Sequence, residues 1–112
     1  MNDLPLVQIT TTLESREDAE KIATTLVEEG LAACVQIDGP IRSVYRWKGT
    51  VETTGEYRLT IKTAASRVEA VTRRVAELHP YELPEIVFLP LGATVNYATW
   101  VRDNTDLEND HA

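Results

Sequence analysis

The chain has 112 residues, of which 43% are hydrophobic, and a formal net charge of −7, so it can form one domain with a single core. The acidic balance excludes nucleic acid and anionic membranes as main partners, because both attract clusters of Lys and Arg. Its one cysteine excludes an intrachain disulfide and a cysteine-based zinc motif. We predict a single domain over residues 1–104 and a disordered acidic tail over residues 105–112.

The sequence predicts neither export nor a membrane span. No run reaches the ~18 apolar residues that a membrane helix needs. The N-terminal segment lacks the basic-then-apolar pattern of a signal peptide. Because a lone thiol also fits a reducing compartment, we expect the protein in the cytoplasm.

The first half predicts a strand, a helix and a second strand. Residues 6–12 are rich in β-branched side chains, which is typical of a strand. Ser15, three residues before Asp18, predicts a helix N-cap, and apolar residues then recur with helical spacing. Gly30 predicts the end of that helix, and residues 31–37 the next strand.

The middle of the chain predicts a long hairpin. Residues 41–47 and 51–61 are β-prone, and Lys48-Gly49-Thr50 between them indicates a turn. Asp38-Gly39-Pro40 should break or bend the chain before the hairpin. Because the far end is polar, we expect it to project beyond the core.

The last third predicts a helix, a buried strand and a short terminal helix. Ser66 and Glu69 form a second capping-box pattern, and Pro80 should end the helix that follows. Residues 86–89 are apolar and β-prone, and residues 97–101 carry one short apolar helical face.

This order predicts an α+β fold, the ferredoxin-like βαββαβ sandwich with a long hairpin between its second and third strands and a short C-terminal helix. Right-handed crossovers would place both main helices on one face of the sheet. The other face and two edges would then be open, with Tyr45, Trp47 and Tyr57 on the projecting hairpin. We therefore predict a closed homo-oligomer in which the hairpin pairs with a neighbour's edge.

A proline-stiffened turn is the first candidate for chemistry. It carries an imidazole, a phenol and two carboxylates within seven positions, at His79, Tyr81, Glu82 and Glu85. His79 is either a helix C-terminal histidine bound to the last-turn carbonyls, or a ligand or acid–base group. No complete metal motif is present, so copper or zinc would require the fold to bring His79, Cys34 and a carboxylate together.

The other candidates each have a simpler interpretation. Cys34, among alanines in a strand, favours a buried and unreactive thiol. Lys62 is either solvated or an anion clamp near the Glu82 turn, Trp47 with its neighbouring lysine favours an interface anchor, and Trp100 favours the core. No nucleophile with a base and no glycine-rich phosphate loop is present, so we do not expect an enzyme.

Four segments together are typical of one family. They are Leu-Val-Glu-Glu-Gly-Leu-Ala-Ala-Cys-Val at 26–35, Ser-Val-Tyr-Arg-Trp-Lys-Gly at 43–49, Ile-Lys-Thr at 61–63, and Leu-His-Pro-Tyr-Glu-Leu-Pro-Glu-Ile at 78–86. In these segments the chain resembles the CutA divalent-cation tolerance proteins, from about residue 7 to residue 101.

The resemblance implies a tight homotrimer of ferredoxin-like domains, similar in architecture to the PII signalling proteins, and a link to tolerance of divalent cations, above all copper. It places a set of polar residues in an inter-subunit cleft: His79, Tyr81, Glu82 and Glu85, with Cys34, Trp47, Lys48 and Lys62 as neighbours. Some members carry a first-strand cysteine and a second histidine where this chain has Thr10 and Leu78. That difference favours weak binding, since copper selectivity depends on soft and imidazole ligands.

Three hypotheses follow. The first is a cytoplasmic homotrimer in the response to divalent metal ions, with no required cofactor, that binds copper or another divalent cation weakly through His79, Glu82, Glu85 and Cys34. The second is a PII-like trimer that senses an anion or nucleotide through Trp47, Lys48, Lys62, Tyr81 and Glu82. The third is a scaffolding trimer without a ligand.

Overall fold

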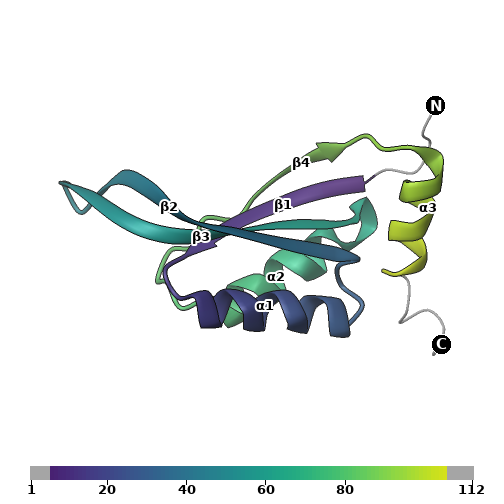
Figure 1. The fold of residues 1–112 in the computed structure, drawn as a ribbon, viewed down its shortest axis with the longest axis horizontal. Helices are drawn as coiled ribbons and strands as arrows, with labels where there is room; N and C mark the ends of the chain where they lie inside the picture. Colours follow the sequence, from purple (N-terminus) through teal and green to yellow (C-terminus); the bar gives the residue numbers. More distant parts are fainter. Residues whose placement is uncertain (1–5, 106–112) are drawn as a thin grey trace.

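The structure, a computed structural model, describes residues 6–105 and has the predicted order of elements (Figure 1). The elements are β1 (Leu6–Leu13), α1 (Arg16–Glu28), β2 (Cys34–Trp47), β3 (Thr50–Ala64), a 3-10 turn (Ala65–Arg67), α2 (Val68–Leu78), β4 (Val87–Leu91) and α3 (Val95–Asp103). None of these helices has the length and hydropathy to span a membrane.

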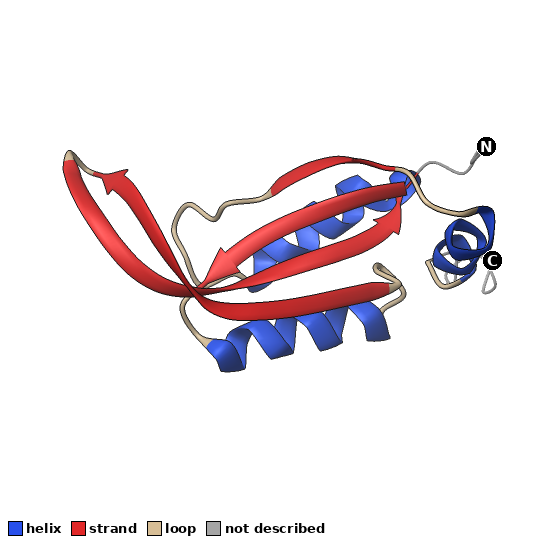
Figure 2. Cartoon of the chain, turned by 45° about the horizontal axis from the view of Figure 1, so that its top comes forward, coloured by secondary structure: helices blue, strands red, loops and turns tan. Residues whose placement is uncertain are grey.

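The four strands form one antiparallel sheet in the order β2-β3-β1-β4. This strand order, with two helical crossovers, is the predicted ferredoxin-like arrangement. Helices α1 and α2 lie on the same face of the sheet, and α3 lies at the end remote from the hairpin (Figure 2). Strands β2 and β4 are therefore the two edges.

The core lies between the sheet and helices α1 and α2. It is built from alternate residues of the central strands and one face of each helix, chiefly Ile9, Leu59, Ile61, Ile22, Leu26, Val71 and Val75, all at most 1% exposed. A smaller cluster of Leu6, Ala98 and Val101 holds α3 against the sheet. Burial of each large apolar side chain contributes about 1.5–3 kcal/mol.

Helix α1 begins and ends at the predicted residues. The hydroxyl of Ser15 accepts a hydrogen bond of 3.0 Å from the backbone N–H of Asp18. Gly30 follows the helix with a φ of 72°, and its N–H donates to the carbonyl of Val27 at 3.1 Å. Only glycine adopts this left-handed geometry at little cost, so Gly30 alone was sufficient to predict where the helix ends.

The hairpin projects beyond the core, as predicted, and the molecule measures 46 × 30 × 21 Å (Figure 1). Its turn consists of Lys48 and Gly49, with φ values of 51° and 84°. Two central residues with positive φ are typical of a type I′ turn, whose twist matches that of the flanking strands.

The predicted boundaries of the second strand are wrong. Strand β2 is continuous from Cys34 to Trp47, and Asp38-Gly39-Pro40 is a shift in register within it rather than a break between two strands. An irregularity of this kind leaves backbone groups unpaired, so a proline without an N–H is tolerated there. Residues 31–33, which we assigned to the strand, precede it.

The predicted second capping box is also wrong. Ser66 lies in the 3-10 turn, and no side chain caps α2, which begins at Val68. Strand β4 begins one residue later than predicted and includes Pro90, which an edge strand tolerates.

Helix α3 differs from prediction in its packing. Trp100 is 45% exposed rather than part of the core, because α3 turns Ala98 and Val101 toward the sheet instead. Thr105, which we assigned to the tail, is buried, and its hydroxyl donates to the carbonyl of Val101 at 2.9 Å. The rest of the predicted tail, residues 106–112, lies outside the described residues.

Candidate functional site

A cavity of about 870 Å³ opens between the hairpin and the turn of residues 79–86. Three aromatic side chains line it, those of Tyr45, Trp47 and Tyr81. Four carboxylates also line it, those of Glu14, Glu56, Glu82 and Glu85. We call this space the acidic cavity, because neither Lys nor Arg is among its lining residues in the described part of the chain.

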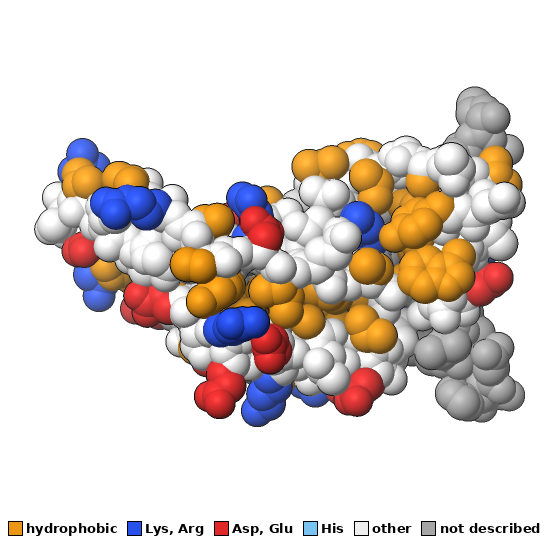
Figure 3. All heavy atoms as spheres, viewed as in Figure 1, with side chains coloured by type: hydrophobic (Ala, Val, Ile, Leu, Met, Phe, Trp, Pro, Cys, Tyr) orange, Lys and Arg blue, Asp and Glu red, His pale blue; other side chains and the backbone are white. Residues whose placement is uncertain are grey.

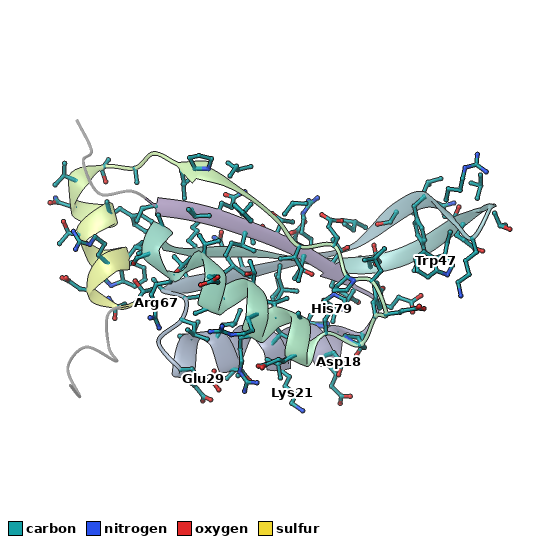
Figure 4. All side chains as sticks on the ribbon, turned by 180° about the vertical axis from the view of Figure 1, so that it is seen from behind. Asp18, Lys21, Glu29, Trp47, Arg67 and His79 are labelled. Carbon is teal, nitrogen blue, oxygen red and sulfur yellow. The ribbon has the colours of Figure 1, made fainter. Side chains whose placement is uncertain are left out.

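His79 anchors the turn that forms one wall of the acidic cavity. Its side chain is only 8% exposed, at the end of α2 and near the base of the hairpin (Figure 4). The N–H of Tyr81 donates to Nδ1 at 3.2 Å, so Nε2 carries the proton and donates to the carbonyl of Thr12 at 3.0 Å. The imidazole therefore bonds to strand β1 and not to the last-turn carbonyls of its own helix.

This arrangement bears on metal binding. Both ring nitrogens of His79 are engaged with the backbone, so a metal ion could bind only after the ring left its position. Burial lowers the pKa of His79, although the bond to Thr12 and the charge of Glu56 act in the opposite direction. The geometry fits a neutral histidine that fixes the turn.

Glu56 is the second buried polar group beside the cavity. It is 5% exposed, and its Oε2 accepts a hydrogen bond of 2.7 Å from the hydroxyl of Tyr81. Burial, together with the bond to Glu56, raises the pKa of Tyr81, so the phenol keeps its proton and acts as the donor. Oε1 of Glu56 has no hydrogen bond within the part of the chain that the structure describes.

Several predicted site residues do meet here. Trp47, Glu82 and Glu85 line the acidic cavity with Tyr81, and the hydroxyl of Thr12 donates to Glu85 at 3.5 Å. Lys48 lies at the hairpin turn, with its Nζ 5.6 Å from the centroid of the Trp47 ring.

Cys34 and Lys62 are not brought to this cavity within one chain. They are paired with each other across β2 and β3, and Lys62 donates to Gln36 at 2.9 Å. The β3 partner of Thr12 is Arg58, four residues from Lys62, or about 13 Å along a strand. Among residues 6–105, no group of three or more His, Cys, Asp or Glu side chains could hold a metal ion. The predicted metal set is therefore not assembled by one chain alone.

Sequence reasoning did not single out Glu56. Its neighbours in the sequence are polar, and we assigned it to the projecting end of the hairpin. Its burial arises when the turn of residues 79–86 comes to lie beside β3, and no local pattern signals that contact.

A comparison with known families identifies the chain. The sequence model described as CutA1 divalent ion tolerance protein matches residues 7–104. The chain belongs to this family. The divalent-cation tolerance protein CutA of Thermus thermophilus is 45% identical over 84% of this chain and 92% of its own length, and the chloroplastic protein CutA of Arabidopsis thaliana is 39% identical over 91% of this chain. The chain spans about 57% of the Arabidopsis relative.

Solved structures agree with the fold. The crystal structure of CutA from Xylella fastidiosa superposes with a TM-score of 0.88 at 40% identity, covering 90% of this chain and 98% of that one. The protein titled divalent cation tolerance protein from Thermus thermophilus gives 0.86 at 42% identity, covering 89% and 98%. The four-stranded antiparallel sheet and helices described above are thus those of the CutA proteins.

The buried imidazole predicts a pH dependence of stability. Because the pKa of His79 is lowered on folding, the unfolded chain binds a proton more readily below its ordinary value of about 6.5. The free energy of unfolding should therefore be greatest above pH 6.5 and fall as the pH drops below that value, through the lowered pKa of the folded state. Urea unfolding of wild type and His79→Gln measures it. In the variant, the free energy of unfolding should no longer fall over this pH range, and at pH 7.5 it should be about 1 kcal/mol lower than in wild type. The same pH dependence in both proteins would contradict its assignment to His79.

The hydrogen bond between Tyr81 and Glu56 predicts that two Tyr→Phe variants will differ in stability. Tyr81→Phe leaves a buried carboxylate without its donor and should cost about 1–3 kcal/mol of unfolding free energy. Tyr45→Phe is the matched control, because Tyr45 is exposed and its hydroxyl bonds only to Thr54. Denaturant unfolding at pH 7.5 should show little change for the control. Equal losses in the two variants would contradict the importance of the buried pair.

Proposed function

We propose that this chain acts in the cellular response to divalent metal ions as a closed homotrimer. The family to which it belongs carries tolerance of divalent cations in its name. The observation that most supports assembly is the apolar edge strand β4, where Val87, Phe88 and Leu89 are 50–57% exposed. Such an edge in water is a template for pairing with another chain.

The opposite edge supports the same proposal. Strand β2 also exposes apolar side chains, among them Ile37 and Val44, and its outer side pairs with no other strand among residues 6–105. Hydrophobic side chains also gather over α3 and along the sheet (Figure 3). Because β2 and β4 are different surfaces, pairing one with the other on a neighbour is head-to-tail, and such an interface forms a ring when the rotation between neighbours closes. The family resemblance supplies three as the number of subunits.

For the ion we propose weak binding by the exposed carboxylates of Glu82 and Glu85 at the rim of the acidic cavity. The four residues predicted from the sequence do not fit a tight copper site in one chain, since His79 is engaged and Cys34 lies elsewhere. Cys34 could contribute only from a neighbouring subunit. Oxygen ligands alone favour low affinity and little selectivity for copper.

We propose no catalytic reaction, and we keep the cytoplasm as the proposed compartment. Curated relatives from Arabidopsis thaliana and Oryza sativa are named chloroplastic, so members of the family differ in location. Since Lys48 and Lys62 lie apart, and the cavity is lined with carboxylates, nothing favours the anion sensor.

Assembly has a direct test. Light scattering should give about three times the chain mass of 12.5 kDa. Leu89→Lys, on the β4 edge, should dissociate the particle, because a charge would be desolvated on pairing. Ala76→Lys, an exposed position on α2, is the control and should leave the mass unchanged. A stable wild-type monomer at micromolar concentration would refute the trimer.

Ion binding is tested by calorimetric titration of Cu(II) and Zn(II) at pH 7.5. The double variant Glu82→Gln, Glu85→Gln should lose binding, since two charged oxygen ligands are removed. His79→Gln is the control and should titrate like wild type, because its imidazole is engaged with the backbone. Loss of binding in the control alone, or no binding by wild type, would contradict the proposal, and the latter would leave a scaffolding role.

A further inference from the structure

We propose that the acidic cavity binds a small organic cation that carries an ammonium or guanidinium group. The binding group would be the buried carboxylate of Glu56, and the wall would be the aromatic rings of Tyr45 and Trp47. This inference goes beyond the proposed role in metal tolerance and does not depend on it.

The charge of the cavity selects the sign of the ligand. Four carboxylates line it, and its lining residues, all within the described part of the chain, include no basic side chain. Clefts lined by one sign of charge raise the local concentration of the opposite ion. A cation is therefore favoured and an anion is opposed.

Glu56 supplies a specific contact. The residue is 5% exposed, Oε2 accepts from the phenol of Tyr81, and Oε1 accepts no hydrogen bond from the described residues. Tyr81 keeps its proton and thus does not neutralise the carboxylate. The second oxygen is therefore open to a charge-assisted N–H···O bond from a ligand in the cavity.

The aromatic wall fits the same ligand. The hydroxyl of Tyr45 is held by Thr54 at 2.8 Å, which fixes the ring on the hairpin. Lys48 already places its Nζ 5.6 Å from the centroid of the Trp47 ring, a distance at which a cation is attracted to the π face. An alkyl chain between two charged ends would lie along these rings.

The size of the cavity and the spacing of its carboxylates fit an organic cation better than a tightly held metal ion, and the weak ion contact proposed above involves Glu82 and Glu85 alone. A cavity of about 870 Å³ is within the range for small-molecule sites, roughly 300–1,000 Å³. A divalent ion needs several oxygen ligands at about 2–2.6 Å, and no group of three or more acidic, His or Cys side chains in residues 6–105 is close enough. Carboxylates spread around a larger space suit a longer ligand with separated charges.

The experiment uses agmatine, which has an ammonium at one end and a guanidinium at the other. The full chain with Trp100→Phe keeps Trp47 as the remaining tryptophan of the two, so its fluorescence reports on the cavity wall. Agmatine should change this fluorescence saturably at moderate ionic strength. Glutarate, a dianion of similar length, should leave the fluorescence unchanged. Excess Zn(II) should compete with agmatine only if the metal ion binds the same carboxylates.

Three variants in this background decide the outcome. Glu56→Gln keeps an acceptor for Tyr81 and removes the charge, so it should weaken agmatine binding by about tenfold or more, whereas Glu20→Gln, an exposed position on α1, should bind normally. Calorimetry of Trp47→Leu, on the projecting hairpin outside the core, should show a several-fold loss. No saturable response from the Trp100→Phe protein at millimolar agmatine, or equal affinity in Glu56→Gln and Glu20→Gln, would overturn the proposal. The Zn(II) titration of the Glu82→Gln, Glu85→Gln double variant tests the metal proposal by itself, so a failure of either proposal can be told from a failure of the other.

Discussion

The hydrogen bond from His79 to the carbonyl of Thr12 is the contact on which the functional end of the molecule depends. It ties the turn after α2 to the end of β1, two parts of the chain 67 residues apart. Prolines on both sides restrict the turn, but they cannot decide where it lies. The imidazole does, because its other nitrogen accepts from Tyr81 and so orients the phenol toward Glu56. One neutral side chain thus positions the floor of the cavity.

That arrangement places an acidic side chain beside the cavity. Glu56 is nearly buried beside Tyr81, and other carboxylates surround the same space. The phenol of Tyr81 bonds Oε2, and Oε1 accepts no hydrogen bond from the described residues. A cleft lined by carboxylates attracts cations. The open oxygen and the sign of the surrounding charge are the physical reasons to look for a cationic partner.

Local signals in the sequence were sufficient where the determining interaction is local. The cap at Ser15, the stop at Gly30 and the turn at Gly49 each follow from the chemistry of one or two residues, and all three were predictable. Ser66 has the same pattern as Ser15, yet the chain enters α2 through a 3-10 turn and the pattern is unused. Trp100 was assigned to the core, but a helix of nine residues buries only the face with Ala98 and Val101.

The candidate site was predictable only in part, for a related reason. Residues 79–86 are adjacent in the sequence, so their joint presence at the cavity could be anticipated, whereas Glu56 and Thr12 join them only through tertiary contact. Cys34 and Lys62 are placed by strand register, which the family resemblance does not give for a single chain.

Assembly and the cavity are linked through the hairpin. The far wall, with Tyr45 and Trp47, lies on a two-stranded ribbon that projects from the core, and two strands alone are marginally stable in water. In a lone chain the ribbon would lose conformational freedom when a ligand bound, and this would reduce affinity. If a neighbour's edge strand pairs with the ribbon, that entropy is lost at assembly and the cavity is preorganised. Ligand affinity should therefore rise with the extent of assembly, so the apolar edges and the acidic cavity are parts of one physical arrangement.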